Sequence, residues 1–432
     1  MPRQATRELI THLLNRLHEV RHDLGMQQVS IGADALFAEM LDSMGMVEFI
    51  MVLAHDLSVT PEMIEQCVDH RFGTVAELAD ALDRAGISPK QNEDPQAWPL
   101  AVGKVGAVQD TSWLAATAMR LPDAREPAAA LNQALLRPMG WLERHAGILE
   151  RRVWATQDPL AAAADAAREC LERTGLSRPD VGALLVTSEA PPILAGLAAA
   201  VHHRLELPKN VVALEVGSAC TGFLAALWTA QRLLPRLDVI LVVAVEAATR
   251  LLQLQPGPGG EAAALFGDGA AATLLSRDDR GREAVRLGRI CTYADGSLGG
   301  LLQIARTGKG EAEVQMSGFE LASRAVEVMA QSVRDLADQH DLKVPDLAAV
   351  VAHGGNGRLP ALLARKLDLP AEKVWSETPT TGNLGSASLP VAWAAHQPVP
   401  SGPVIWTAVG AGLTWGAALL GDAFENRDAA AR

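Results

Sequence analysis

The first 87 residues carry apolar side chains at helical spacing. In "RELITHLLNRLHEVRHDL", residues 7–24, apolar positions recur at i, i+3, i+4 and i+7, which predicts an amphipathic helix. The segments "MGMVEFIMVLAHDL", "TPEMIEQCV" and "TVAELADAL" predict three more helices. Thr60 with Pro61 is a typical helix start, and Thr74 with Glu77 has capping-box spacing. We therefore expect residues 1–87 to form a small all-α, four-helix domain.

Residues 101–425 follow a different pattern, in which short Val/Leu/Ile runs alternate with longer Ala/Leu-rich helical segments. This alternation predicts an α/β domain with largely buried sheets. A strand run leading to a small-residue turn and a helix occurs in "VVALEVGSACTGFLAALWTA" and again in "KVWSETPTTGNLGSASLPVAWAAH". The two halves thus share the same strand-turn-helix pattern, which indicates a duplicated α/β unit. Residues 88–100, polar and Pro-containing, are expected to be a linker, and residues 426–432 a C-terminal tail.

Composition narrows the class of protein. The chain has 432 residues, 49% hydrophobic and 21% charged, as expected for globular domains. Its net charge of −13 argues against nucleic-acid binding, which needs clustered cations. We find no signal segment and no apolar stretch long enough to span a bilayer, so we expect a cytoplasmic protein without membrane contact. Four scattered cysteines predict neither a disulfide framework nor a metal site.

Three polar residues stand at predicted strand-to-helix junctions. Cys220 lies among small residues before a helical pattern, where free N–H groups favour a thiolate. His353 follows the apolar run "LAAVVA", and Asn383 lies in the turn "TTGNLGSAS". Each one alone has an ordinary structural explanation, but ligands of α/β sheets gather at such strand ends. The combination predicts a nucleophilic active site, whereas Cys67, Cys170 and Cys291 are expected to be structural.

The motifs of the larger part resemble the thiolase superfamily and, within it, β-ketoacyl-acyl-carrier-protein synthase III. "ACTGFLAAL", "AHGGNGR", "GNLGSASLP", "LFGDGAAATLL" and "VGAGLTWGAALL" follow the family order. The resemblance implies a duplicated five-layer αβαβα fold and a homodimer. It also implies that Cys220 carries the acyl group, and that the backbone of Cys220 with the Gly410–Gly412 turn forms an oxyanion hole. His353 and Asn383 would then stabilise the enolate of a decarboxylating malonyl thioester, and the retained Asn383 favours Claisen condensation.

The resemblance is weaker where the family binds coenzyme A. The family has a Trp followed four residues later by an Arg; here Trp141 is kept, but His145 takes the Arg position, with Arg144 beside it. Arg152 is retained, and Arg358 matches a carrier-docking Arg. Acyl groups on carrier proteins are therefore an alternative to coenzyme A thioesters.

Glu189, in "VTSEAPP", is a second departure from the family. In the related 3-hydroxy-3-methylglutaryl-CoA synthases a Glu precedes the Cys and serves as the general base of an aldol-type addition. This reaction, with Glu189 as a possible general base, is the first alternative, and simple acyl transfer to or from a carrier is another. A non-catalytic scaffold with a vestigial Cys is a third, against which the intact Cys, His and Asn argue.

The segment "LFAEMLDSMGMVEFI" resembles the acyl carrier protein family, whose second helix opens with Asp-Ser-Leu. Asp42 and Ser43 form a common helix cap, but the surrounding Asp34, Phe37 and Val47-Glu48 extend the match. The resemblance implies that Ser43 bears a covalent 4′-phosphopantetheine arm added by a phosphopantetheinyl transferase. It further implies a carrier fused to a ketosynthase for polyketide or fatty acid biosynthesis, with other carrier proteins as possible partners and no metal.

Overall fold

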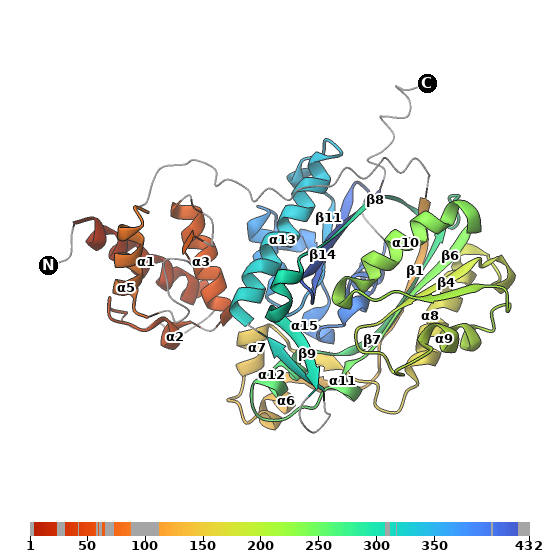
Figure 1. Ribbon diagram of the computed structural model, residues 1–432, viewed down its shortest axis with the longest axis horizontal. Coiled ribbons are helices and arrows are strands. Elements are labelled where there is room, and N and C mark those ends of the chain that lie inside the picture. Colours follow the sequence, from red (N-terminus) through yellow and green to blue (C-terminus); the bar gives the residue numbers. More distant parts are fainter. Residues whose placement is uncertain are drawn as a thin grey trace. The chain divides into compact units, whose positions relative to one another are not determined.

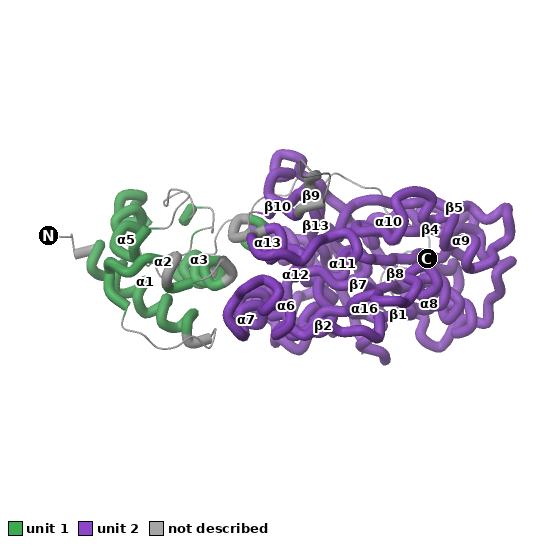
Figure 2. Tube along the Cα trace, turned by 90° about the horizontal axis from the view of Figure 1, so that it is seen from below, with its two compact units in different colours: residues 1–105, 318–323 green, residues 106–317, 324–432 purple. Residues whose placement is uncertain are grey.

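The computed structural model describes residues 4–23, 31–41, 43–57, 59, 63–64, 73–87, 112–306, 312–316, 318–398 and 401–421. Two compact units emerge from it (Figure 2). One consists of residues 1–105 with 318–323, and the other of residues 106–317 with 324–432. The predicted linker at 88–100, the tail at 426–432, most of "TPEMIEQCV" and Cys67 lie outside the described residues.

Helices build the described part of the smaller unit's first 87 residues. They are α1 (Gln4–Asp23), α2 (Phe37–Met40), α3 (Ser43–Leu57) and α5 (Val75–Arg84). The predicted capping box at the start of α5 is present, because Thr74 N donates to Glu77 Oε2 at 2.7 Å and Glu77 N donates to Thr74 Oγ1 at 3.3 Å. Leu13 of α1 and Phe49 of α3 are fully buried in the shared apolar core.

The larger unit contains one ten-stranded sheet in the order β12-β11-β13-β14-β8-β1-β7-β6-β4-β5. Its first half comprises β1 (Ser112–Arg120), β4 (Ala183–Thr187), β5 (Val212–Glu215), β6 (Val239–Ala247) and β7 (Asp268–Ser276). Its second half comprises β8 (Val285–Ala294), β11 (Ala349–Ala352), β12 (Val374–Trp375), β13 (Val404–Gly410) and β14 (Thr414–Leu420).

The strand order confirms the predicted duplication. Counted along the chain within each half, both halves have the order third, second, fourth, fifth, first. The directions also agree: β5, β4 and β6 are parallel with β7 and β1 following antiparallel, and β12, β11 and β13 are parallel with β14 and β8 following antiparallel. The halves join through an antiparallel pairing of β1 with β8.

Two helices form the layer between the halves, and Figure 1 labels the first of them, α10 (Gly222–Leu237). α10 contacts β4 and β6 of the first half and β8 and β14 of the second, and α16 (Ser388–Ala395) contacts β11 and β13 as well as β1 and β7. On β4, Leu185 packs into this central core while Leu184 faces the outer helices. Alternate residues of a strand point to opposite faces, so a strand covered on both sides is apolar throughout.

Outer helices cover the remaining faces. α8 (Pro159–Thr174) and α9 (Leu197–Leu205) pack on the first half, and α14 (Leu359–Lys366) packs on β12. α13 (Gly318–Asp338) reaches β13, since Thr407 Oγ1 donates to the Met329 carbonyl at 3.5 Å. The resulting order of helix, strand, helix, strand and helix is the layered α/β arrangement predicted for this part of the chain.

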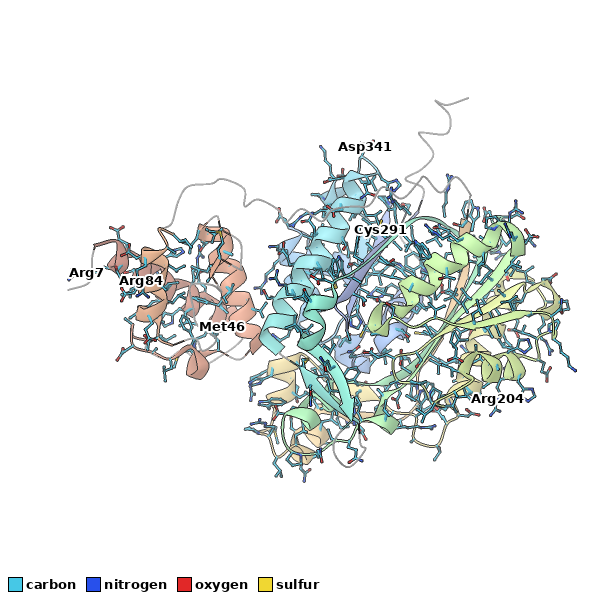
Figure 3. The ribbon with its side chains drawn as sticks, viewed as in Figure 1. Arg7, Met46, Arg84, Arg204, Cys291 and Asp341 are labelled. Atoms are coloured by element: carbon cyan, nitrogen blue, oxygen red, sulfur yellow. The ribbon has the colours of Figure 1, made fainter. Side chains whose placement is uncertain are left out.

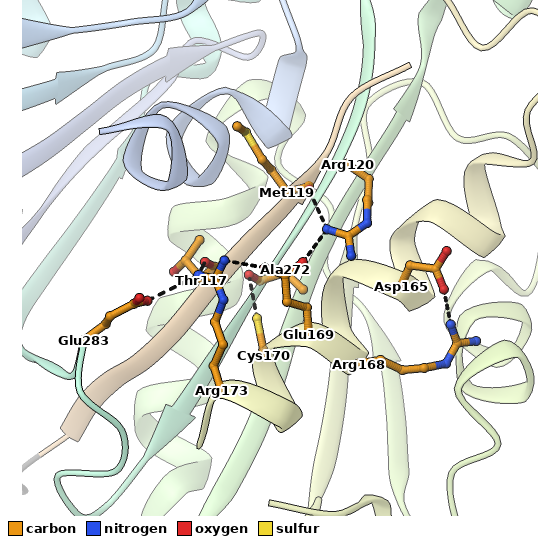
Figure 4. Close-up of polar contacts among 10 residues, drawn as sticks. All are labelled: Thr117, Met119, Arg120, Asp165, Arg168, Glu169, Cys170, Arg173, Ala272 and Glu283. Carbon is orange, nitrogen blue, oxygen red and sulfur yellow. Dashed lines mark hydrogen bonds and ion pairs between the residues drawn. The ribbon is translucent and has the colours of Figure 1, made fainter. Parts of the chain in front are cut away.

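Polar contacts fix α8 on the sheet (Figure 4). Arg120 of β1 pairs with Glu169 at 2.5 Å, and Arg173 donates to the Thr117 carbonyl at 3.1 Å. The buried Cys170 thiol donates to the Ala272 carbonyl at 3.3 Å, and burial raises its pKa to about 12. Cys170 is thus a structural residue, as predicted. Cys291 lies on β8 (Figure 3).

Shorter elements complete the unit: β2 (Arg125–Pro127), α6 (Ala128–Ala134), α7 (Trp141–Ala146), β3 (Glu150–Arg152), α11 (Ala248–Leu251), α12 (Pro258–Leu265), β9 (Leu302–Arg306), β10 (Ala312–Met316) and α15 (Thr378–Thr381). Two short 3₁₀ turns, η2 (Ala219–Thr221) and η6 (Gly385–Ala387), precede α10 and α16 respectively. None of the helices in the described ranges is long and apolar enough to cross a membrane.

Candidate active site

Cys220 lies in η2, between β5 and α10, at the strand-to-helix junction that the sequence predicts. The preceding Ala219 has a φ of +47°, in the left-handed region that residues with a Cβ rarely adopt. The next glycine, Gly222, packs so closely that a Cβ there would lie 2.2 Å from Thr187 Oγ1. The strained turn and the small neighbour place the thiol, only 3% exposed, where β4 ends.

The turn after β13 lies against the backbone of Cys220. A Cβ at Gly410 would be 2.9 Å from Cys220 N and 3.1 Å from Thr221 N, so only glycine fits this approach. Gly412 has a φ of +132°, and Thr414 Oγ1 lies 2.8 Å from Thr221 Oγ1 across the same turn. The predicted oxyanion-hole segments therefore adjoin each other at Cys220.

His353 directly follows β11 and is 2% exposed. Its backbone N donates to the Thr407 carbonyl at 2.9 Å, and its Nδ1 lies 3.1 Å from Ser388 Oγ at the start of α16. Burial lowers the pKa of His353 to about 4, so the ring is neutral at neutral pH. When the Ser388 hydroxyl donates to Nδ1, the proton of the neutral ring resides on Nε2, which becomes a hydrogen-bond donor.

Asn383 precedes η6, and its backbone is held on both sides. Its N donates to the Leu265 carbonyl at 2.7 Å, and its carbonyl accepts from Gly267 N at 3.0 Å. Its side-chain Oδ1 accepts from Gly385 N at 2.9 Å. This last bond fixes the amide so that Nδ2 is the end with hydrogen atoms to donate elsewhere.

Glu189 contacts the candidate nucleophile directly. The Cys220 thiol donates to Glu189 Oε2 at 2.8 Å. Burial and the nearby Glu246 carboxylate raise the pKa of Glu189 to about 7. Burial and the Glu189 carboxylate raise the pKa of Cys220 well above its ordinary value. The expectation that the helix start favours a Cys220 thiolate is therefore wrong for this arrangement, because desolvation and the adjacent acid outweigh the helix end.

Glu246 is a site residue that the sequence analysis missed. It is the penultimate residue of β6, is 1% exposed, and accepts hydrogen bonds from Ser188 Oγ, Glu189 N, Ala190 N, Ser386 N and Ser386 Oγ. It thereby ties the loop after β4 to η6. The available signal was a lone carboxylate at the end of the apolar run "VILVVAVEA", since such a buried charge requires dedicated partners.

Three of these residues line one small cavity. Glu189, Glu246 and Asn383 border it together with the apolar side chains of Ala248, Leu252 and Phe266. Gly385, whose φ is +50°, borders both acids, because a Cβ there would lie 3.0 Å from Glu189 Oε2 and from Glu246 Oε1. The structure thus brings Glu189 and Asn383, which are far apart in sequence, to one cavity beside the Cys220 thiol.

The residues predicted to bind coenzyme A or a carrier protein lie at two separate places in the larger unit. Trp141, the first residue of α7, stacks on His145 with 4.8 Å between ring centroids, and the Arg137 guanidinium lies 5.1 Å from its ring. Arg358 joins the same helix, since its Nη1 donates to the Arg144 carbonyl at 3.2 Å. Arg152 is on β3, where its Nη1 donates to the Pro122 carbonyl at 2.9 Å.

Comparisons with known proteins agree with this geometry. The family model described as 3-oxoacyl-[acyl-carrier-protein (ACP)] synthase III matches residues 214–296, and that of its C terminal matches residues 337–421. A β-ketoacyl-[acyl-carrier-protein] synthase III of Aquifex aeolicus is 30% identical over 290 residues, which cover 65% of this chain and 89% of the relative.

Solved structures show the same fold. A crystal structure of 3-oxoacyl-[acyl-carrier-protein] synthase III from Aquifex aeolicus has a TM-score of 0.65 at 28% identity, covering 72% of this chain and 100% of that one. The priming β-ketosynthase of a polyketide biosynthetic pathway has a TM-score of 0.66 at 25% identity, covering 74% of this chain and 98% of that one.

The approach of Gly410 to Cys220 gives a test of the oxyanion hole. We expect Gly410→Ala to slow acylation of Cys220 by about 10²–10³, because the methyl group would displace the Cys220 amide from the position in which it stabilises the oxyanion. The rate is measured by intact-protein mass spectrometry after mixing with an acyl thioester. Gly300→Ala is the matched control, since a Cβ there meets nothing within 4 Å. Wild-type acylation by a folded Gly410→Ala protein would contradict the assignment.

Proposed function

Because this chain belongs to the 3-oxoacyl-[acyl-carrier-protein] synthase III family and is therefore a condensing acyltransferase, we propose that it joins an acyl group held on Cys220 to a malonyl-type thioester by decarboxylative Claisen condensation. The observation that carries the proposal is the contact of η2, which bears Cys220, with η6, which follows Asn383, and with the end of β13. Cys220, the segment that follows Asn383 and the glycine turn after β13 thus come together from both halves of the duplicated unit.

The first half-reaction is acyl transfer. Cys220 attacks the carbonyl carbon of an acyl thioester, and the negative charge develops on the carbonyl oxygen. Backbone N–H groups at Cys220 and at the turn of Gly410 and Gly412 stabilise that oxyanion. Collapse of the tetrahedral intermediate expels the donor thiol and leaves the acyl group on Sγ.

The second half-reaction uses the two side chains of the second half. His353 Nε2–H and Asn383 Nδ2–H donate to the thioester carbonyl of the malonyl unit. As CO₂ leaves, the electron pair moves into the enolate, whose oxygen carries the charge that these donors stabilise. The carbanion carbon then attacks the acyl-Cys220 carbonyl, a carbon–carbon bond forms, and the Cys220 sulfur leaves. A neutral His353 suits this role, because Nε2–H donates to the enolate oxygen while Nδ1 accepts from the Ser388 hydroxyl.

The thioester donors are proposed to be acyl and malonyl groups on carriers as well as on coenzyme A. The Trp141 ring already stacks on His145, and Arg137 lies near it. His145 thus occupies one face of the Trp141 ring, which supports a reduced dependence of the protein on coenzyme A thioesters. Arg358, beside Arg144 on the same surface, is the proposed contact for an acidic carrier protein.

The N-terminal helical unit is proposed to be a fused acyl carrier. Ser43 is the first residue of the 15-residue helix α3, and a phosphate ester is favoured at a helix start by free N–H groups and by the dipole. The 4′-phosphopantetheine arm would supply a flexible thiol that carries the thioester. Fusion to a condensing enzyme favours a dedicated polyketide or fatty acid pathway in the cytoplasm.

The proposed homodimer forms at the edge strand β5. Val212 and Leu214 of β5 are 43% and 42% exposed, and as i and i+2 residues they share one face of the strand. An edge strand with exposed apolar residues is a template for pairing with a second copy. This arrangement supports association of two larger units through β5.

One contact of the Cys220 thiol favours a second candidate reaction. The 2.8 Å hydrogen bond from Cys220 Sγ to Glu189 Oε2 places a carboxylate beside the atom that would hold the acyl group. In an aldol-type addition this carboxylate would remove an α-proton from the acyl-Cys220, and no CO₂ would be released. We rank this reaction second, because Asn383 borders the cavity and decarboxylation creates a carbanion without any base.

Removal of the enolate donors should separate the two half-reactions. We expect His353→Ala and Asn383→Ala to form the acyl-Cys220 adduct but to lose about 10²–10³ in condensation rate, because each removes a donor to the enolate oxygen. Mass spectrometry measures the adduct, and CO₂ release from a malonyl thioester measures condensation. Cys220→Ala is the control that loses the adduct. An Asn383→Ala protein that condenses at the wild-type rate would refute the decarboxylative mechanism.

Glu189→Gln distinguishes the two condensations when the acyl-enzyme is formed beforehand. The variant is first acylated to completion by long incubation, and malonyl thioester is then added. In decarboxylative condensation we expect CO₂ and product at nearly the wild-type rate, since no base acts in this step. Loss of product from the preformed acyl-enzyme with a β-ketoacyl thioester as the acceptor, with no CO₂ from the wild type on a malonyl thioester, would instead support aldol-type addition.

Ser43 should accept one phosphopantetheine arm. We expect a phosphopantetheinyl transferase with coenzyme A to add one arm to the wild-type chain and none to Ser43→Ala, because only a serine hydroxyl at the carrier motif forms the phosphodiester. Intact mass detects the addition, and Ser58→Ala is the matched control. Modification that persists in Ser43→Ala would show that the carrier assignment is wrong.

A further inference from the structure

The Cys220 thiol is a poor nucleophile in its resting state. Burial and the Glu189 carboxylate both raise its pKa, so at neutral pH the sulfur keeps its proton. A thiolate is the attacking species in acyl transfer. The protein must therefore remove the thiol proton as the thioester is attacked, and the position of a base within hydrogen-bond reach becomes the decisive feature.

Geometry favours Glu189 over His353 as this base. The thiol donates to Glu189 Oε2 at 2.8 Å, within the distance needed for direct proton transfer. His353, in contrast, directs its Nδ1 to Ser388 Oγ at 3.1 Å. Burial also lowers the pKa of His353 to about 4, which makes its ring a weak base.

We propose that Glu189 is a catalytic residue of acyl transfer, taking the proton of the Cys220 thiol as the sulfur attacks and returning it to the departing thiol. The proposal rests on the acyl-Cys220 step of the proposed function. Glu189 thus acts in the acylation of Cys220 and does not remove a proton from the carbon that forms the new carbon–carbon bond.

The proton and the electrons balance without another reactant. The S–H bond of Cys220 breaks, an O–H bond forms on Glu189 Oε2, and the sulfur electron pair forms the new S–C bond. When the tetrahedral intermediate collapses, the bond from carbon to the donor sulfur breaks. The donor sulfur takes the proton from Glu189 and leaves as a thiol, so Glu189 is again a carboxylate.

Glu246 is the positioning residue for this step. It accepts from the backbone N of Glu189 at 3.0 Å and from Ala190 N at 2.8 Å, which anchors the loop that carries the base. On its other side it binds Ser386 of η6. Its charge also helps to raise the pKa of Glu189 to about 7, near the value at which a general base is most effective at neutral pH.

The surroundings of Glu189 predict one pH-dependent step. Among the described residues, the titratable groups that face its carboxylate are the Cys220 thiol from η2 and the Glu246 carboxylate from β6; from η6 it meets the uncharged Gly385. Because the ionised carboxylate is the base, acylation should be slow below the pKa of Glu189, rise through about pH 7 and level off above it.

The test is the rate of Cys220 acylation between pH 5 and pH 9, roughly two units on either side of the expected inflection. The full-length protein is mixed with acetyl-coenzyme A, and the adduct is followed by rapid quench and intact mass. We expect Glu189→Gln to acylate about 10²–10³ more slowly at pH 8, without an inflection near pH 7. Glu189→Asp, which keeps a carboxylate, should recover part of the rate and the inflection. Glu172→Gln, an exposed change on α8, is the matched control.

Glu246→Gln tests the positioning role with the same profile. Removing the neighbouring negative charge should move the inflection to lower pH, whereas a merely structural defect would lower the rate at every pH and leave the inflection in place. Such an unshifted inflection would overturn the role of Glu246. Should that variant not fold, the Glu189 variants still decide the main proposal.

The outcomes separate this proposal from the proposed function. An acylation profile in Glu189→Gln that matches the wild type, inflection included, would overturn Glu189 as the base while leaving condensation intact. Failure of the wild-type protein to form any Cys220 adduct, at any pH and with any acyl thioester, would instead overturn the proposed acyl-enzyme itself.

Discussion

The packing of α10 and α16 between the two halves of the sheet is the constraint on which the candidate site depends. Each helix contacts strands of both halves, and each begins with a 3₁₀ turn beside a functional residue. Apolar side chains such as Phe223 and Trp393, both almost fully buried, fill the space between the sheets. Hydrophobic burial on this scale fixes where the helices start, and so fixes Cys220 against the Asn383 segment.

At the strand ends, hydrogen bonds hold together segments that the apolar packing brings close to each other. Glu246 accepts hydrogen bonds from five donor groups of the loop after β4 and of η6, which belong to different halves. A buried carboxylate is costly unless it is fully hydrogen-bonded, so its presence at 1% exposure requires both segments to be in place. The same anion then acts on its neighbour and makes Glu189 a stronger base.

Desolvation shifts the pKa values of the three titratable groups of the site, and the direction of each shift follows from the charge of the group. It raises the pKa of Glu189 and of Cys220, and it lowers the pKa of His353, because burial disfavours the charged form in each case. The result at neutral pH is a protonated thiol beside a carboxylate near its titration point, and a neutral imidazole. In the proposed mechanism, this combination assigns a proton-transfer step to Cys220 and a hydrogen-bond-donating role to His353.

The sequence by itself predicted the α/β class and the capping box of α5 and indicated a duplicated unit, because apolar periodicity and capping are local properties of the chain. It also placed Cys220, His353 and Asn383 at strand-to-helix junctions, since each follows or precedes a recognisable run. Tertiary structure alone decided that Glu189 meets the Cys220 thiol, that Glu246 joins the two halves, and that His145 covers Trp141. It also reversed the expected sign of the Cys220 pKa shift. The physical reason is that hydrogen bonding and desolvation depend on distances between segments 31 to 140 residues apart, which no local pattern encodes.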